Sequence, residues 1–320
     1  MVLLSMDGVS KTLKDTPLFE QVTMGVQQGE RIGLVGPNGC GKSTFLSLIS
    51  GRLTPDTGTI ATARNLSVSL LEQHPRIREG QTVAEYLYDS DHPSIALLNR
   101  YRSLLDHYHH DSAHSEQKLH RIMEEIEREH GWLIENRYAS ILSELAGPAL
   151  DSCMDQLSGG MVKKVTIART FSVKADLILL DEPTNHLDID SIQWLERYLV
   201  QQQCSVILVT HDRYLLDHVC TQILEFDRAS VYSHPGAYAE FLQRREERLS
   251  GEQAEQQRLK TVLRRELEWL SRGPKARTGK DSGRKARIEV MQESLVDPAA
   301  QMAQFSSAHR RMGKKILELE

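Results

Sequence analysis

The amino-acid sequence predicts an α/β protein with a parallel sheet, followed by a long helical hairpin. Two short, continuous apolar runs, Leu177–Leu180 and Val206–Val209, are typical of strands that are buried on both faces of a parallel sheet. Between residues 80 and 150, apolar residues recur at three- and four-residue spacing, which indicates amphipathic helices. Residues 238–271 are rich in Glu, Arg, Gln and Leu and contain no proline, so they predict one long helix.

Composition narrows the class of protein. The chain has 320 residues, of which 26% are charged and 40% hydrophobic, as expected for a soluble globular protein of one large domain or two smaller ones. No apolar run approaches the ~20 residues that a membrane span needs, and Met1–Asp7 lacks the basic region of a secretory signal. The four cysteines are widely spaced and contain no C-x-x-C pair. These features predict a reduced, cytoplasmic protein without disulfides, a zinc site or a membrane segment.

The elements follow one another in three blocks. In residues 1–75, turn signals separate strand-like runs at Val2–Met6, Arg31–Val35 and Leu66–Leu71. The helical block that follows contains candidate helices at Thr82–Leu87, Ile95–Leu105 and Leu119–Trp132. The α/β pattern then returns in residues 155–230, with a helix at Ile192–Val200 and a late hairpin of Ile223–Phe226 and Ala229–Ser233.

The C-terminal region predicts two helices about a polar tip. The long helix carries one apolar stripe, formed by Leu259, Val262, Leu263, Leu267 and Leu270. Gly273-Pro274 must end it, because proline removes a backbone donor and clashes with the preceding turn. A second helical run begins near Arg284 and carries Ile288, Met291 and Leu295. We therefore expect an antiparallel helical hairpin.

One motif carries specific chemistry. Gly36-Pro37-Asn38-Gly39-Cys40-Gly41-Lys42-Ser43-Thr44 fits G-x-x-x-x-G-K-[ST], a loop that wraps nucleotide phosphates. It lies between a predicted strand and a predicted helix, which is the context that the motif requires. Backbone N–H groups and the helix N-terminus attract phosphate. Lys42 is expected to reach the β- and γ-phosphates, and Ser43 to ligate Mg²⁺.

A second motif supplies two acids at the end of a predicted strand. Asp181 and Glu182 directly follow the apolar run Leu177–Leu180. In a site built around the phosphate loop, Asp181 would hold Mg²⁺ through water, and Glu182 would polarise the attacking water. These residues predict a bound nucleotide with Mg²⁺ and hydrolysis of its phosphate as the reaction.

Between these motifs, Leu157-Ser158-Gly159-Gly160-Met161 precedes a helical run, and in this position it resembles the signature of ATP-binding cassette (ABC) proteins. The resemblance implies that Gln73 forms the Q-loop beside Mg²⁺, Asp188 the D-loop, and His211 the switch that contacts the γ-phosphate. Leu13 stands where the family usually stacks an aromatic ring on adenine, so a preference for ATP over GTP stays open. Phe19 lies too far along to replace it and is expected in the core.

The residue patterns at 181–188 and 210–217 are similar to the motifs of the ABC-F family, whose members carry two tandem cassettes. The tip at 272–277 resembles the Uup-type branch of that family. The resemblance implies a P-loop cassette at 1–237 with an N-terminal antiparallel β portion and a helical subdomain at about 75–165. A linker hairpin would occupy 238–312, and a truncated second cassette would begin at 313–320. Catalytic sites in this superfamily are composite, so Ser158 and Gly160 would serve the ATP of a partner cassette, in cis or in a homodimer.

The predicted linker tip concentrates positive charge. Seven cations against one acid give residues 272–287 a net charge of +6, whereas the whole chain carries −5. The cations are Arg272, Lys275, Arg277, Lys280, Arg284, Lys285 and Arg287. A compact basic tip suits RNA phosphates, and the family resemblance implies insertion into the ribosome near tRNA and rRNA.

Two other functions share the same ATP site. The ATPase subunit of an ABC transporter would have the same fold, but it would carry no basic hairpin. A DNA-repair or chromosome-associated ATPase commonly inserts its long helices between the phosphate loop and the signature, whereas here they follow His211. DNA therefore stays a possible target of the tip, beside RNA.

Overall fold

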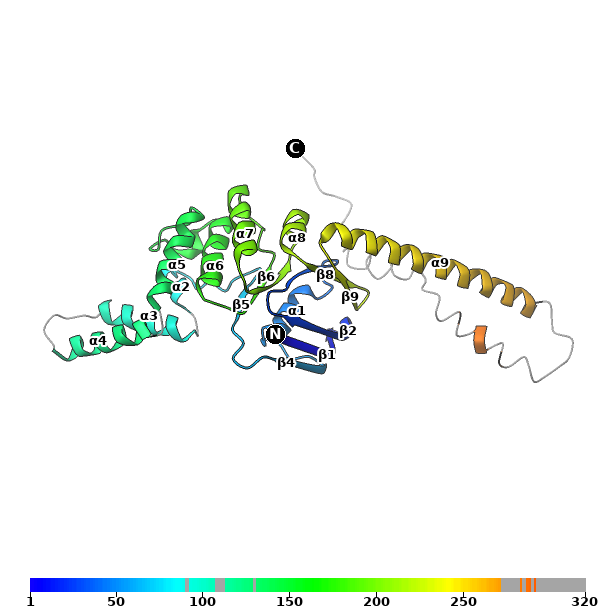
Figure 1. Ribbon diagram of the computed structural model, residues 1–320, viewed down its shortest axis with the longest axis horizontal. Coiled ribbons are helices and arrows are strands. Elements are labelled where there is room, and N and C mark those ends of the chain that lie inside the picture. Colours follow the sequence, from blue (N-terminus) through cyan, green and yellow to red (C-terminus); the bar gives the residue numbers. More distant parts are fainter. Residues whose placement is uncertain are drawn as a thin grey trace, which may run out of the picture. The chain divides into compact units, whose positions relative to one another are not determined.

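The computed structural model describes residues 1–89, 92–106, 113–128 and 131–271, together with Gly283, residues 286–288 and Met291. The chain divides into two compact units, Met1–Leu242 and Gln243–Glu320 (Figure 1). The first unit holds the two sheets and the helices that cover them. The predicted domain boundaries at residues 237 and 312 are not decided by this division and stay predictions.

Two sheets build the first unit. Among the described residues, β1 (Val2–Leu13), β2 (Thr16–Gln27) and β4 (Thr57–Thr62) form an antiparallel sheet of order β2-β1-β4. A second sheet has the order β5-β6-β7-β3-β8-β9. Its members are β5 (Val68–Leu71), β6 (Leu177–Asp181), β7 (Ser205–Val209), β3 (Arg31–Val35), β8 (Gln222–Asp227) and β9 (Ser230–Pro235). All its pairings are parallel except β8 with β9.

Helices occupy both sides of the parallel strands. The described helices of the first unit are α1 (Lys42–Ile49), α2 (Val83–Tyr88), α3 (Pro93–Asp106), α4 (Ala113–Arg128), α5 (Gly131–Glu144), α6 (Gly159–Ser172), α7 (Ile189–Gln201) and α8 (Arg213–Val219). Figure 1 shows α2 to α5 grouped at the end of the unit away from β1, β2 and β4. The predicted helical block therefore forms a cluster of its own.

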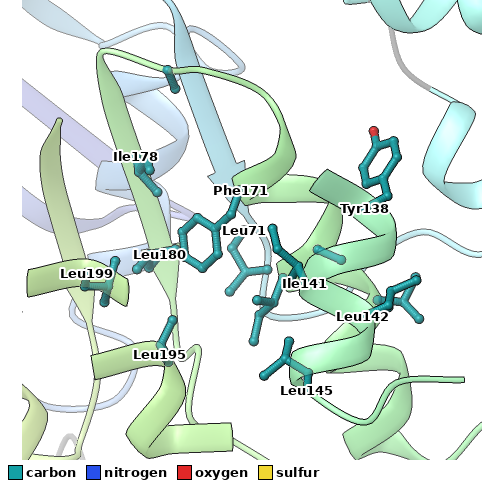
Figure 2. Close-up of a cluster of buried hydrophobic side chains, with 14 of the residues drawn as sticks. Leu71, Tyr138, Ile141, Leu142, Leu145, Phe171, Ile178, Leu180, Leu195 and Leu199 are labelled. Atoms are coloured by element: carbon teal, nitrogen blue, oxygen red, sulfur yellow. The ribbon is translucent and has the colours of Figure 1, made fainter. Parts of the chain in front are cut away.

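Alternate residues of each parallel strand enter two separate cores. Leu177 and Leu179 of β6 join the cluster that contains α1 and the antiparallel sheet. Ile178 and Leu180 of the same strand join the cluster of α5 to α8. Figure 2 shows part of this second cluster, where side chains from β5, α5, α6, β6 and α7 meet. Successive side chains of a strand point to opposite faces, which explains why the sequence shows a continuous apolar run.

Two predictions about the elements are wrong in detail. The expected helix Leu119–Trp132 is divided, because α4 ends at Arg128 and α5 begins at Gly131. At Gly131 a Cβ would lie 2.9 Å from the Ile126 side chain, so the absence of a side chain lets α5 begin against α4. The first strand extends beyond Met6 to Leu13, because β1 pairs with both β2 and β4.

The long helix α9 (Tyr238–Ser271) has the predicted bounds. In its described part, Leu263 is buried and Leu259 half-buried, whereas Val262 and Leu267 are 36% and 40% exposed, so the covered stripe is narrower than predicted. Of the second helical run, residues 286–288 and Met291 are helical and Ile288 is buried. Leu295 lies outside the described residues. No helix in the described part of the chain combines the length and the apolar character needed to cross a membrane.

Phe19 lies in the core, as predicted, and is fully buried. Its ring meets Phe45 and Phe226 edge-on, with centroids 5.5 and 5.9 Å away. We expect Phe19→Ala to lower the free energy of unfolding by about 3–5 kcal/mol, because the cavity removes contacts with both rings. Urea unfolding followed by circular dichroism measures this loss. Leu133→Ala is the control, since Leu133 is 55% exposed and its loss should cost less than about 0.5 kcal/mol; equal losses would contradict the packing.

Candidate functional site

The segment Gly36–Thr44 joins the carboxyl end of β3 to α1. Gly36 admits no side chain, because a Cβ there would lie 2.6 Å from the backbone oxygen of Phe226. Gly41 has a φ of 102°, and a Cβ there would lie 2.9 Å from Cβ of Leu18. The loop therefore requires glycine at both positions. It delivers the chain to the first turn of α1, whose N–H groups have no partners within the helix.

Lys42 begins α1 and is only 8% exposed. Its ammonium donates hydrogen bonds to the carbonyl oxygens of Gly36, at 2.7 Å, and Pro37, at 3.0 Å. The side chain thus lies over the loop that precedes it. An ammonium has three N–H donors, so Lys42 keeps the capacity for a further acceptor. The lysine and the helix N-terminus together favour an anion at this end of the site.

The two acids lie at the carboxyl end of β6, both 6% exposed. Burial raises the pKa of Asp181, while a hydrogen bond from Ser43 and the positive charges of Lys163 and Lys42 oppose this rise. Burial also raises the pKa of Glu182. Glu182 has a φ of 46°, an uncommon conformation for a residue with a side chain, and its N–H donates to the Val209 oxygen at 2.9 Å. Backbone strain of this kind gathers at functional sites.

His211 approaches Glu182 from the neighbouring strand β7. Its Nε2 lies 3.4 Å from Glu182 Oε1, and its side chain is 64% exposed. The position of His211 is fixed on its C-terminal side, because Asp212 caps α8 by accepting hydrogen bonds from the N–H groups of Tyr214 and Leu215. The imidazole therefore stands at the open side of the acid pair.

A cavity of about 400 Å³ joins these groups. It brings together most of the predicted residues of the phosphate loop with the predicted Gln73, Asp181, Glu182 and His211. The lining residues are Leu13, Leu18, Asn38, Gly39, Gly41, Lys42, Ser43, Thr44, Gln73, Asp181, Glu182, Asn185, Val209 and His211. Gly36, Pro37 and Cys40 belong to the loop but do not line the cavity.

The predicted signature residues lie apart from this cavity. Ser158 caps α6, where its hydroxyl oxygen accepts a hydrogen bond from the N–H of Met161 at 3.3 Å. A Cβ on Gly160 would lie 2.5 Å from the His186 oxygen, so the start of α6 packs closely on the segment after Glu182. Neither Leu157–Met161 nor Asp188 lines the cavity.

Asp188 is exposed and forms the N-cap of α7. Its carboxylate accepts a hydrogen bond from Lys164 at 2.7 Å, which together with the bond from Ser191 holds its pKa well below the usual range. The ion pair ties the helix that starts at the signature to the start of α7. The helix that starts at the predicted signature is therefore fixed to the predicted D-loop residue.

The residues fit a magnesium nucleotide. The Lys42 ammonium and the α1 N-terminus suit phosphate oxygens, and the Ser43 hydroxyl, the Gln73 amide and the Asp181 carboxylate are oxygen donors of the kind that Mg²⁺ prefers. Buried oxygens of Asp181 and Glu182 have no hydrogen-bond partner among the described residues. The described residues hold no cluster of three or more His, Cys, Asp or Glu that would form a metal site by protein groups alone. Mg²⁺ commonly takes only one or two carboxylates and completes its shell with phosphates and water.

Sequence reasoning missed three lining residues and one buried charge. Leu18, Asn185 and Val209 line the cavity, and Asn185 belongs to the 181–188 segment that carries the family resemblance. The buried charge is Lys163, and nothing in the sequence indicated that this lysine is buried. Of the predicted basic tip, Arg287 is described and exposed, whereas Arg272, Lys275, Arg277, Lys280, Arg284 and Lys285 lie outside the described residues.

Comparison with known proteins places this chain in a family. A family model described as ABC transporter matches residues 19–185, and a second with the same description matches 224–307. The chain is 36% identical to the uncharacterized ABC transporter ATP-binding protein YfmR of Bacillus subtilis, over 100% of this chain and 51% of that protein. It is 34% identical to the energy-dependent translational throttle protein EttA of Mycobacterium tuberculosis, over 90% and 52%. It is 30% identical to the ATP-binding protein Uup of Escherichia coli, over 100% and 51%.

Solved structures share the fold. A structure of an ATP-binding subunit of an ABC transporter covers 73% of this chain and 90% of its own, with a TM-score of 0.54 at 23% identity. The dimeric structure of a bacterial ABC transporter cassette also gives a TM-score of 0.54, at 19% identity, over 73% and 98%. The predicted fold class, a P-loop cassette with an antiparallel β portion, is confirmed.

The chain spans about half the length of the curated relatives it matches. Its family is nevertheless clear, because the similarity to these relatives extends over 90–100% of this chain and two family models match it. The chain is an ATP-binding cassette protein and belongs to the ABC-F family.

Proposed function

We propose that this chain binds ATP with Mg²⁺ in the cavity beside β3, β6 and β7, and that it hydrolyses ATP there. One observation carries the proposal: a single cavity gathers a phosphate-binding lysine, a hydroxyl, two buried acids and an exposed histidine. ABC ATPase domains support ATP hydrolysis in general, and the chain belongs to such a family. Leu13 and Leu18 offer the base apolar contact, so the proposal does not extend to a preference for ATP over GTP.

Within this proposal, we assign the roles from the sequence motifs and the family resemblance, together with the geometry described above. Lys42 and the start of α1 bind the phosphates, and Ser43, Gln73 and Asp181 hold Mg²⁺, which supplies positive charge to the phosphate oxygens. Glu182 polarises the attacking water, because its buried carboxylate stands at the end of β6 with one unpartnered oxygen. His211, 3.4 Å from Glu182, orients that carboxylate and contacts the γ-phosphate.

We further propose that a second cassette completes each site. The signature residues do not reach the cavity of their own chain, although Ser158 and the first glycines of α6 form a helix N-terminus suited to phosphate. Three large apolar side chains are exposed: Leu13, which lines the cavity, by 57%, Ile189, next to Asp188, by 73%, and Tyr214, three residues after His211, by 81%. A partner cassette would cover them. The relatives are about twice as long as this chain, which leaves room in them for such a partner.

We propose that the cycle of ATP binding and hydrolysis acts on the ribosome, in the cytoplasm. The similarity to a protein named as an energy-dependent translational throttle supports this proposal. So does the net charge of +6 in residues 272–287, which suits the phosphates of rRNA or tRNA. ATP binding would close two cassettes and hydrolysis would reopen them, and this motion would control the grip of the linker hairpin.

Because the site is composite, we expect hydrolysis per chain to rise with chain concentration. Ser158→Ala should lower the turnover at saturating ATP by about tenfold or more, since it removes a group that serves the partner's nucleotide. Binding of a fluorescent ATP analogue to dilute chain should not change. Lys42→Ala is the control that should weaken binding itself. A rate per chain that is constant across concentration would contradict the need for a second cassette.

Hydrolysis should depend on pH through Glu182. The carboxyl must be ionised to polarise water, and burial raises its pKa above the usual value of about 4.5. Turnover should therefore fall as pH decreases, with a midpoint above pH 4.5. A pH–rate profile at saturating Mg²⁺ and ATP tests this expectation. A profile that stays flat down to pH 4.5 would assign water activation to another group.

Ribosome binding is tested by co-sedimentation of the chain carrying Glu182→Gln, which should keep ATP bound. The experiment is run at concentrations where the chain pairs. We expect pelleting with ribosomes in the presence of ATP only, and weaker pelleting as salt rises. Arg287→Glu should weaken pelleting and reduce the slope of log affinity against log salt by about 1, whereas Arg258→Glu, an exposed control on α9, should not.

Absence of pelleting with and without ATP would contradict the translation proposal. Full displacement of the chain by a DNA duplex, with no ATP dependence, would instead indicate DNA as the target of the tip.

A further inference from the structure

Helix α8 begins directly after the histidine of the site and carries an acid near its other end. Asp212 is the N-cap residue of this helix, and His211 precedes it. Asp217 lies in the last turn of α8 and is exposed. A negative charge is unfavourable at this end of a helix, because the helix dipole places partial negative charge there. Within α8 itself, an acid at position 217 therefore has no stabilising role.

The carboxylate of Asp217 instead contacts the first turn of the long helix α9. Its Oδ1 accepts a hydrogen bond from the backbone N–H of Ala239 at 3.1 Å. Because α9 begins at Tyr238, and the N–H of Phe241 donates to the Ala237 oxygen at 3.1 Å, Ala237 is the N-cap residue of α9. An alanine side chain offers no acceptor to the free N–H groups of the first turn. Asp217 therefore supplies, from another helix, the capping oxygen that Ala237 lacks.

The start of α9 fits this contact in charge and in packing. A helix N-terminus carries partial positive charge, so a carboxylate that is unfavourable at the end of α8 is favourable at the start of α9. Phe241, in the first turn of α9, is 1% exposed and belongs to the same buried cluster as Leu215 and Leu216 of α8. The capping bond and this shared core both lie within the first compact unit, Met1–Leu242. The end of α8 and the start of α9 are thus joined by polar and apolar groups together.

The backbone joins the same two segments a second time. The N–H of Gly236, which precedes α9, donates a hydrogen bond to the oxygen of Thr221, just after α8, at 2.9 Å. Gly236 has a φ of 108°, and a Cβ there would overlap the carboxylate of Glu240. Position 236 therefore requires glycine, and the chain turns from β9 into α9 at a residue with no room for a side chain. The first turn of α9 is held against the end of α8 by this turn as well as by Asp217.

At its other end, α8 meets the candidate ATP site. His211 lines the cavity, and its Nε2 lies 3.4 Å from Glu182 Oε1. Asp212 then caps the helix, and Leu215 and Leu216 bury one of its faces, so α8 is packed to move as a unit. The helix has seven residues and is therefore about 10 Å long. One short, packed helix thus connects the cavity with the capped start of α9.

We propose that Asp217 is a positioning residue that couples the nucleotide state of the cavity to α9. His211, when it contacts the γ-phosphate, would hold the start of α8, and Asp217 at the end of the same helix would hold the N–H of Ala239. Loss of the γ-phosphate would release His211 and loosen the cap. The proposal rests on the ATP site proposed above and names the residue through which that site reaches the linker hairpin.

The cap itself is tested without nucleotide, by amide hydrogen exchange of the whole chain. Asp217→Ala should speed exchange in the peptide that covers the first turn of α9 by about fivefold, because the turn loses its acceptor. Asp217→Asn should stay within about twofold of wild type, since its amide oxygen also accepts a hydrogen bond. Glu124→Ala, which removes an exposed acid from α4, is the matched control. Unchanged exchange in Asp217→Ala would overturn the cap, whether or not the chain binds ATP.

The coupling is tested by the response of the same peptide to ATP, in the Glu182→Gln background and at concentrations where the chain pairs. ATP with Mg²⁺ should slow exchange in the first turn of α9 by about threefold or more. His211→Ala should abolish this response. Asp217→Ala should abolish it too, while binding of the fluorescent ATP analogue stays within about twofold, and Asp217→Asn should restore it. A cap with a purely structural role would shift the exchange rate but leave the response to ATP intact.

The failure of the coupling and the failure of the ATP site are distinguishable. If the chain binds the ATP analogue but Asp217→Ala keeps the full response of α9 to ATP, the coupling role is overturned and the ATP site stands. If Asp217→Asn loses the response as Asp217→Ala does, the hydrogen bond is not the route and the proposal fails. If the chain with Asp217 intact does not bind the ATP analogue, the proposed function fails, and with it the coupling.

Discussion

The order of three parallel strands governs the whole site. β7 pairs with β3 on one side and with β6 on the other, so the carboxyl ends of these strands lie in one row. The phosphate loop follows β3, the acids end β6, and His211 follows β7 between them. Residues 139 positions apart in the chain, Lys42 and Asp181, thereby line one cavity. The hydrogen-bonded ladder sets these positions, and ligands of open α/β sheets bind at this edge.

The same row concentrates negative charge that the protein only partly compensates. Asp181 and Glu182 are buried, and burial raises the pKa of both despite Lys42, His211 and Lys163 nearby. The left-handed backbone of Glu182 adds local strain, which the hydrogen bond to Val209 and the buried strand ends hold in place. Such a site destabilises the fold when no cation is bound, and it favours the binding of a cation. Its destabilising features are therefore consistent with metal binding rather than with stability.

Much of the fold could be predicted because the signals are local. The composition of Leu177–Leu180 alone predicts a strand that is buried on both faces. The glycines in residues 36–41 indicate positions where the backbone tolerates no side chain, and the structure shows this at Gly36 and Gly41. The division between α4 and α5 was missed, because the apolar spacing continues across it, whereas in the structure Gly131 begins α5 where a Cβ would lie 2.9 Å from the Ile126 side chain. Lys163 also gave no signal, since a lysine in a helix is usually solvated, and only the packing of α6 shows that this one is buried.

The contacts at the start of α6 bear on the proposal that two cassettes act together. The start of α6 does not line the cavity of its own chain, yet Lys164 fixes this helix to Asp188 by an ion pair. A nucleotide of a partner cassette that contacts the signature, as proposed above, would therefore act on a helix that is tied to the segment following Asp181 and Glu182 in its own chain. Interiors are close-packed, so a shift of this helix must change the surroundings of that ion pair. In the proposed pair of cassettes, this tie would give nucleotide bound at the signature a physical route to the acids of the site in the same chain as that signature.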